Sequence, residues 1–225
     1  MKIIAHIEND FTEKFGVPRQ SGITENIISK IVFEPEYRIA EAIRGLEQYS
    51  HIWILWQFSE NPENYWNPTV RPPRLGGNKR MGVFATRSPF RPNSIGLSSV
   101  KIVKIDMNTS QGAVIYVSGA DMMNNTPIID IKPYLPYTDC HTDATNGFAL
   151  ASKEDILKVE IPDNLLEMIP YEKRDGLSSV LAQNPVPQYH HNPDRIYSMK
   201  FGNLDVSFKT DGITLTVTNI KKENS

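Results

Sequence analysis

The side chains best able to bind an anion gather in one stretch of the chain, residues 65–105. This stretch contains no Asp or Glu, although an even spread of the acidic residues would place about five there. Its cations are Arg71, Arg74, Lys79, Arg80, Arg87, Arg91, Lys101 and Lys104. Because guanidinium groups pair with phosphates and carboxylates through two parallel hydrogen bonds, the stretch indicates recognition of a phosphate or a nucleotide. The alternative is a basic face that serves only solubility.

Proline and glycine between the arginines favour recognition over solubility. They are dense in residues 71–78 (RPPRLGGN) and 82–96 (GVFATRSPFRPNSIG). Proline lacks an N–H and has a fixed φ, so these segments cannot form a regular helix. They are typical of rigid loops that present guanidinium groups, and solubility alone does not require a fixed loop geometry.

The bulk composition limits the class of protein. The chain has 225 residues, 40% of them apolar, and a net charge of −2, so the basic stretch is a local patch on a balanced protein. Cys140 is the single cysteine, which excludes an internal disulfide and predicts a cytoplasmic protein. We expect no signal peptide and no membrane span, because no apolar run approaches 18 residues.

The elements expected to position these loops are mostly strands. We expect strands at 3–8, 27–33, 51–58, 97–106, 113–118 and 127–137. The turn at 108–112 makes a hairpin of the fourth and fifth. One helix is expected over residues 36–46, since Pro35 precedes apolar residues at helical spacing. About six strands of uneven spacing favour a small β-barrel over a doubly wound sheet.

The C-terminal third has a different character. Residues 138–150 are predicted to be a linker between a domain at 1–137 and a small α+β domain at 151–225, which would bind a nucleic acid or support the barrel. In the latter, helices are expected at 164–169 with Asp163 as N-cap and at 177–183 after Asp175 or Gly176. Strands are expected at 195–201, 204–209 and 213–220, the last two joined through an Asp-Gly turn.

Most common catalytic motifs are absent from the sequence. It has no Gly-x-Gly-x-x-Gly, Walker loop, His-Glu-x-x-His, Cys-x-x-Cys or Gly-x-Ser-x-Gly. His190 and His191 have no third ligand nearby, so no metal site is predicted. The residues alone therefore predict a nucleotide- or nucleic-acid-binding β protein with no evident nucleophile.

Four long and chemically unusual motifs carry a family resemblance. They are residues 14–20 (KFGVPRQ), 71–78 (RPPRLGGN), 81–93 (MGVFATRSPFRPN) and 126–136 (TPIIDIKPYLP). In this order they resemble the TsaA-like (TrmO) family of S-adenosylmethionine-dependent tRNA methyltransferases. Residues 181–187 (LAQNPVP) resemble the C-terminal appendage of its longer, bacterial-type members.

The resemblance implies a fold and an activity. It implies a small β-barrel that binds S-adenosylmethionine outside the Rossmann class, usually in a homodimer. It also implies methylation of N6 of threonylcarbamoyl-adenosine, beside the anticodon of threonine tRNA. The competing hypotheses are a module that binds tRNA or S-adenosylmethionine without turnover, a methyltransferase with another acceptor and, more remotely, a hydrolase.

The resemblance also implies the residues of a cofactor pocket. They are Pro18, Arg19, Gln20, Ser59, Glu60, Arg87, Leu97, Asn125, Thr126, Pro127 and Ile128. Arg19 or Arg87 would bind the amino-acid carboxylate of the cofactor through two hydrogen bonds. The other reading of Arg19 is a surface residue of a proline-flanked loop, and that of Leu97 is a core strand residue.

Catalytic and tRNA-binding residues follow from the same motifs. Asp130, Tyr134 and Tyr137 are the catalytic candidates, because they lie beside the cofactor-binding stretch. For Asp130 the alternative is a simple ion pair, and for the tyrosines it is packing. The predicted tRNA contacts are Arg71, Arg74, Lys79, Arg80 and Arg91. Arg71 or Arg74 could instead bind the threonyl carboxylate of the modified base.

Overall fold

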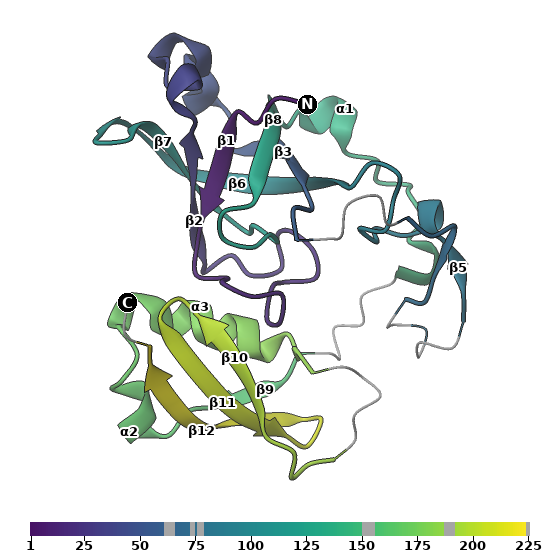
Figure 1. Ribbon diagram of the computed structural model, residues 1–225, viewed down its shortest axis with the longest axis vertical. Helices are drawn as coiled ribbons and strands as arrows, with labels where there is room; N and C mark the ends of the chain where they lie inside the picture. The colour runs from purple at the N-terminus through teal and green to yellow at the C-terminus, as the bar shows by residue number, and fades with distance from the viewer. Residues whose placement is uncertain (61–65, 73–74, 76–78, 150–155, 187–191, 224–225) are drawn as a thin grey trace.

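Six antiparallel strands close into a barrel in the first part of the chain (Figure 1). The structure is a computed structural model that describes residues 1–60, 66–72, 75, 79–149, 156–186 and 192–223. In order around the barrel, the strands are β1 (Ala5–Glu8), β2 (Ile28–Phe33), β7 (Gly112–Ser118), β6 (Ile95–Thr109), β3 (His51–Gln57) and β8 (Pro127–Pro133). The predicted small, mainly β barrel and its β6–β7 hairpin are confirmed.

Apolar side chains that point inward at every second position of the strands fill the barrel interior. On β3 the side chains of Ile52, Ile54 and Trp56 point inward and are buried, while their neighbours are more exposed. They pack with Ile115 of β7 and Ile128 of β8, among others, into one core. A small barrel filled in this way leaves room for a ligand only at its open ends.

The helix predicted over residues 36–46 is wrong. The chain forms three short 3₁₀ turns there, Pro35–Tyr37, Ala40–Ile43 and Leu46–Gln48. Arg38 donates from Nε to the carbonyl oxygen of Phe33 at 2.8 Å, which turns the backbone between the first two. Ile39 is extended and 54% exposed while Ile43 is buried in the barrel core, so the apolar residues that suggested a helix do not form one continuous buried face.

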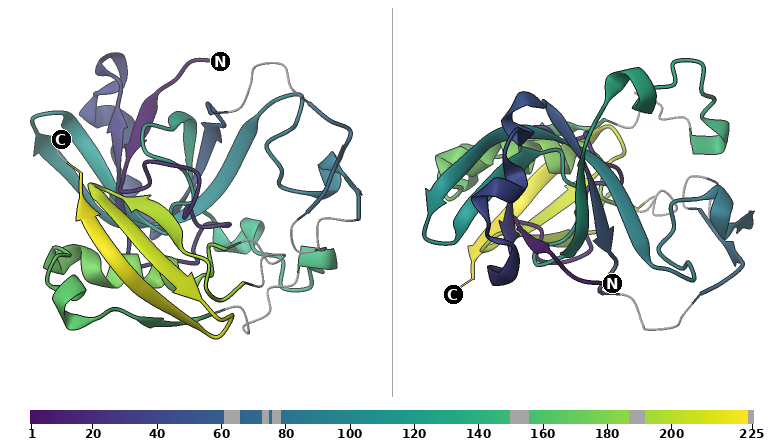
Figure 2. Two further views of the ribbon diagram at one scale, coloured as in Figure 1. Left: turned by 60° about the horizontal axis from the view of Figure 1, so that its bottom comes forward. Right: turned by 90° about the horizontal axis from the view of Figure 1, so that it is seen from above.

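The basic loops project from the barrel between β3 and β6 (Figure 2). Their regular structure is a two-stranded ribbon of β4 (Thr69–Val70) and β5 (Met81–Gly82), followed by a 3₁₀ turn at Val83–Ala85. No described residue of this excursion is in an α-helix, as the proline and glycine content predicts.

A four-stranded sheet with helices forms the C-terminal part. The sheet order is β10 (Tyr197–Phe201), β11 (Leu204–Thr210), β12 (Thr214–Lys222) and β9 (Lys158–Glu160), with β9 parallel to β12. Its helices are α2 (Asp163–Leu166) and α3 (Tyr171–Ala182). Helix α1 (Pro136–Asp139) follows β8 and lies beside the barrel, where Trp53 donates from Nε1 to Asp139 Oδ2 at 2.8 Å (Figure 1), and a 3₁₀ turn spans Gly147–Ala149. The predicted α+β character and the Asp-Gly hairpin between β11 and β12 are present.

Helix α3 is longer than the sequence suggested. It begins at Tyr171 with Pro170 as its N-cap, so the proposed start at Asp175 or Gly176 is wrong. Gly176 lies inside the helix, where a Cβ would stand 3.2 Å from the Ile27 side chain. Similarly, Asp163 is the first residue of α2 and Pro162 is the cap.

The N-terminal segment after β1 packs into the C-terminal domain. Phe11 and Ile27 belong to the same buried core as Leu177, Phe201 and Val206. The rings of Phe11 and Phe201 meet edge to face, with centroids 6.1 Å apart. The packing unit of the C-terminal domain therefore includes part of the first 30 residues of the chain.

Polar contacts fasten this segment at the same place. Lys173 Nζ lies 2.7 Å from Asp10 Oδ1, and the Lys200 amide donates to Glu13 Oε1 at 2.8 Å. Gly16 has a φ of +94°, and a Cβ there would come within 2.6 Å of the Met199 side chain. Residues 14–20, one of the long motifs, are thus held between the barrel and β10.

Candidate functional site

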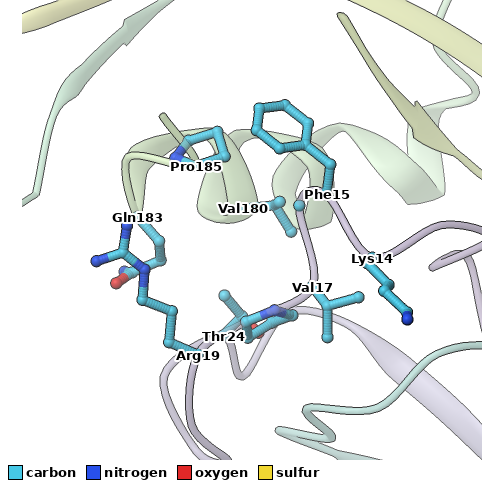
Figure 3. A pocket seen from close by; sticks show the side chains of 10 residues that line it. Lys14, Phe15, Val17, Arg19, Thr24, Val180, Gln183 and Pro185 are labelled. Atoms are coloured by element: carbon cyan, nitrogen blue, oxygen red, sulfur yellow. The ribbon is translucent and has the colours of Figure 1, made fainter. Parts of the chain in front are cut away.

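Two hollows lie on either side of the 14–19 segment. The barrel-mouth pocket, about 180 Å³, is lined by Lys14, Val17, Trp56, Phe58, Ser59, Glu60, Pro89, Asp121, Met122, Met123 and Thr126. The interdomain pocket, about 190 Å³ and shown in Figure 3, is lined by Lys14, Phe15, Gly16, Val17, Pro18, Arg19, Thr24, Val180, Gln183 and Pro185. Lys14 and Val17 line both, so the two pockets share one wall.

A chain of hydrogen bonds leads from the barrel core into the barrel-mouth pocket. Trp56 donates from Nε1 to the Ser98 hydroxyl oxygen at 2.9 Å, and Ser98 donates to Asp121 Oδ1 at 2.5 Å. Ser98 is buried and reaches Asp121 across the mouth of the barrel. These hydrogen bonds fix the orientation of the Asp121 carboxylate, because Trp56 and Ser98 are themselves held in the paired strands β3 and β6.

Burial raises the pKa of Asp121 above its ordinary value of 3.8, and the hydrogen bond from Ser98 and the charge of Arg87 only partly oppose that rise. No ion pair joins Asp121 to another described residue. Sequence analysis missed this residue, since it stands alone in a loop and only the fold places Ser98 and Trp56 beside it. A buried carboxylate of this kind, in a pocket with aromatic walls, is a candidate for proton transfer or cation binding.

The loop that carries Asp121 is anchored on β1 and on the 18–22 turn. Asn9 donates from Nδ2 to the Met122 carbonyl at 2.9 Å and from its amide to Asn124 Oδ1 at 3.0 Å. Gly119, with φ of +83°, approaches Gly22 so closely that a Cβ would stand 3.0 Å from the Gly22 backbone. The pocket wall is therefore set by backbone contacts as well as by side chains.

The predicted cofactor residues fall into four groups. Ser59, Glu60 and Thr126 line the barrel-mouth pocket, and Pro18 and Arg19 line the interdomain pocket. Gln20 accepts a hydrogen bond from the Arg87 guanidinium. The remaining residues, Leu97, Asn125, Pro127 and Ile128, line neither pocket.

Arg19 and Gln20 are adjacent in sequence but turn to different partners. The Gln20 side chain meets Arg87, whose charge is felt by Asp121 at the barrel mouth. The Arg19 guanidinium instead donates to the Asn184 carbonyl at 3.3 Å and runs toward Gln183 in the interdomain pocket (Figure 3). The side chain of Arg19 thus belongs to a different hollow from that of Arg87.

The predicted catalytic residues do not line either pocket. Asp130 Oδ2 forms an ion pair with Lys132 Nζ at 3.0 Å, which was the alternative reading of this residue. Tyr134 follows β8, and its amide bonds to His51 at the start of β3, whereas the barrel mouth lies at Trp56 near the other end of that strand. Tyr137 is 86% exposed. Their catalytic assignment stays a prediction that this arrangement does not support.

The predicted tRNA contacts differ in their surroundings. Arg71, Lys79 and Arg80 are exposed, and Arg80 donates to the Thr69 hydroxyl at 3.1 Å. Arg91 is half-buried and donates to the carbonyls of Val83 at 3.1 Å and Thr86 at 2.8 Å. Arg91 therefore stabilises its own loop, while the other three point to solvent. Arg74 lies outside the described residues.

Two further features can be stated for the described part of the chain. It contains no helix long and apolar enough to cross a bilayer. It also holds no group of three or more His, Cys, Asp or Glu side chains arranged for a metal ion. His190 and His191 are not among the described residues.

A closed antiparallel barrel with an apolar, carboxylate-bearing pocket at its mouth defines a ligand-binding domain outside the Rossmann class. The chain matches the tRNA-methyltransferase O N-terminal domain over residues 6–140 and the TrmO C-terminal domain over residues 158–223. It belongs to the TrmO family.

Similar proteins cover nearly the whole chain. The tRNA (adenine(37)-N6)-methyltransferase of Escherichia coli K12 is 40% identical over 214 residues, 92% of this chain and 91% of that protein. A Pseudomonas aeruginosa relative, whose name describes an S-adenosylmethionine-dependent methyltransferase, is 37% identical over 90% of this chain and 89% of its own. A crystal structure of TrmO from the same genus and species superposes with a TM-score of 0.77 at 30% identity, covering 98% of this chain and 95% of that one.

Proposed function

We propose that this protein is an S-adenosylmethionine-dependent tRNA methyltransferase that methylates N6 of adenine 37. The observation that carries the proposal is the barrel-mouth pocket of a TrmO-family barrel, with Asp121 fixed by Ser98 and Trp56 beneath aromatic and methionine walls. The E. coli relative named for this reaction is similar over 92% of the chain.

The residues of this pocket fit S-adenosylmethionine. The rings of Trp56 and Phe58 have centroids 4.2 Å apart. With the side chain of Met122 they provide an apolar surface for the adenine and for the methionine moiety of the cofactor. Arg87, oriented by Gln20, is suited to a carboxylate. Among the predicted residues, Ser59, Glu60 and Thr126 complete the pocket wall. When bound, this cofactor supplies a methyl group already activated on a sulfonium centre.

Asp121 is the group we assign to proton removal. The N6 nitrogen carries a hydrogen that must leave when it is methylated, and the carboxylate of Asp121 accepts that proton. Burial raises its pKa, which makes it a stronger base than an ordinary Asp at neutral pH. Ser98 donates to Oδ1 and so orients the carboxylate that receives the proton. Beyond this, the residues act mainly by aligning the two reactants.

The finer assignments rest on the family resemblance carried by the motifs of this chain. The acceptor is the threonylcarbamoyl form of adenine 37 in threonine tRNA, and the exposed Arg71, Lys79 and Arg80 contact its phosphates. The protein works in the cytoplasm as a homodimer. The outward-facing, partly exposed apolar side chains of Leu97, Val103 and Met107 on β6 support a surface for a second copy.

Transfer of labelled methyl from S-adenosylmethionine to tRNA tests this proposal. We expect label in tRNA that carries threonylcarbamoyl-adenosine and none in tRNA that lacks it. Label in both would retain the methyltransferase and change the acceptor. Cofactor and tRNA binding with no label in either would identify a binding module and overturn the enzymatic proposal.

A further inference from the structure

The interdomain pocket contains a buried polar atom that has no hydrogen-bond partner. Thr24 is 1% exposed, lines the pocket, and its hydroxyl bonds to no described residue. Next to the pocket, Asn184 Oδ1 is also buried and without a hydrogen bond, and Asn184 has a left-handed φ of 50°. Buried polar groups normally have partners, so these two atoms indicate that a polar ligand group completes the site.

The walls of this pocket are of two kinds. Val17, Val180 and Pro185 provide an apolar surface, while Arg19 and Gln183 provide a cation and an amide at the rim. Arg19 is the polar group best suited to a planar anion, because its guanidinium offers parallel donors. The combination suits a small group that carries a carboxylate, a hydroxyl and a short aliphatic part.

The pocket is also adjacent to the methyl-transfer site. It shares Lys14 and Val17 with the barrel-mouth pocket, and Lys14 Nζ reaches across to the Glu60 carbonyl at 2.7 Å. The interdomain pocket therefore lies next to the pocket in which N6 of the acceptor base would face Asp121, within reach of a substituent that passes over their shared wall. The C-terminal motif at residues 181–187 contributes Gln183 and Pro185 to it, which gives that motif a role.

We infer that the interdomain pocket binds the threonyl group of the acceptor base, with Arg19 on its carboxylate and Thr24 at its hydroxyl. This inference rests on the proposed function and deepens it. It assigns the Arg19 side chain to the acceptor rather than to the cofactor, and it makes the C-terminal domain part of substrate selection. The negative group in the pocket could come from this carboxylate or from an RNA phosphate, and the two are separable by experiment.

Binding of an anticodon stem-loop RNA, measured by fluorescence anisotropy with S-adenosylhomocysteine present, tests the inference without turnover. The stem-loop is compared in three forms, with threonylcarbamoyl-adenosine, with its carboxylate converted to an amide, and unmodified. For the unchanged protein we expect about tenfold or greater preference for the carboxylate form over the other two. In Arg19→Ala we expect this preference to disappear.

Matched measurements separate the explanations. Arg44→Ala removes an arginine that is 76% exposed and lines neither pocket, and it should keep the preference. Arg19→Ala should bind S-adenosylmethionine within about twofold of the unchanged protein by calorimetry. If Arg19→Ala weakens all three RNAs equally, Arg19 contacts a phosphate and the inference is overturned. If it weakens cofactor binding and keeps the RNA preference, Arg19 belongs to the cofactor and the inference is equally overturned.

Thr24→Val removes the hydroxyl at nearly constant volume. We expect it to keep the carboxylate preference and to lose the discrimination between threonylcarbamoyl and glycylcarbamoyl side chains; unchanged discrimination would exclude the threonyl hydroxyl from this site. A failure of the proposed function can be distinguished from a failure of this inference. If only the proposed function is wrong, the unchanged protein transfers no methyl group to modified RNA, but it still prefers the carboxylate form and that preference still depends on Arg19.

Discussion

Ser98 donates its hydroxyl hydrogen to Asp121 across the mouth of the barrel while accepting the indole N–H of Trp56. The half-buried Asp121 carboxylate is thus connected through Ser98 to a tryptophan of the barrel core, and it lies at the pocket where we propose methyl transfer. The first two predictions concern that carboxylate.

Asp121→Asn should lower kcat about a hundredfold, because the amide cannot accept a proton while it can still accept the Ser98 hydrogen bond. Methyl transfer under saturating substrates measures this, and calorimetry should show S-adenosylmethionine affinity within a few fold. Asp130→Asn, at a carboxylate paired with Lys132, is the matched control and should stay near full activity. The reverse result would restore Asp130 as the catalytic carboxylate.

The stability of the protein should depend on the charge of Asp121. Burial raises its pKa in the folded state, so between 3.8 and the raised value the folded state binds more protons than the unfolded state. The contribution of Asp121 to the free energy of unfolding therefore falls as pH rises through this window. Urea unfolding from pH 4 to 7 should show wild type losing stability relative to Asp121→Asn. A constant difference between the two proteins would contradict it.

Arg87→Ala should abolish or weaken S-adenosylmethionine binding, by at least about tenfold, since it removes the guanidinium that pairs with Gln20 and whose charge acts on Asp121 in the barrel-mouth pocket. Isothermal titration calorimetry measures this directly. Arg44→Ala, at an exposed arginine that pairs with Glu41, should bind normally. Near-normal affinity in Arg87→Ala would remove Arg87 from the cofactor site.

The exposed basic side chains should act through salt-dependent binding. Alanine at Arg71, Lys79 or Arg80 should each reduce the slope of log affinity for tRNA against log salt concentration by about 0.7 to 0.9. Arg74→Ala is expected to weaken tRNA binding and leave cofactor affinity unchanged. Arg91→Ala should instead keep the slope and lower stability by about 1–3 kcal/mol, because Arg91 donates to two loop carbonyls. A reduced slope in Arg91→Ala would return it to the RNA-binding residues.

Phe11→Ala should destabilise the protein by about 3–5 kcal/mol in urea unfolding, because Phe11 is buried at 1% exposure in the C-terminal core. Ile213→Ala, at a side chain 77% exposed, should change stability by no more than about 0.5 kcal/mol. A small effect at Phe11 would mean that the two domains do not share this core.

The barrel could be predicted because each strand carries its own pattern. The alternation of Ile52, Ile54 and Trp56 on β3, and the turn between β6 and β7, are local signals that the structure preserves. The 36–46 helix failed for the opposite reason. Its spacing was helical, but Arg38 binds the Phe33 carbonyl and Ile39 is left exposed while Ile43 is buried, so the apolar residues at that spacing do not share one buried face.

Residues of the candidate site could be predicted from the sequence only where they belong to one of the long family motifs. The motif at 14–20 pointed to the pockets, yet it could not show that Arg19 and Gln20 diverge, because that depends on contacts with Asn184 and Arg87. Asp121 had no local signal at all. Its environment comes from Ser98 and Trp56, which lie 23 and 65 positions earlier in the sequence.

The anchoring of residues 10–16 in the C-terminal core sets an order for biosynthesis. Phe11 and Gly16 are synthesised well before the residues that cover them, Phe201 and Met199 of β10, which lie more than 180 positions later in the chain. Until β10 has been made, Phe11 stays uncovered and the segment at 14–20 lacks its support. The two pockets, which share Lys14 and Val17 of this segment, therefore take their final form only after β10 has packed against it.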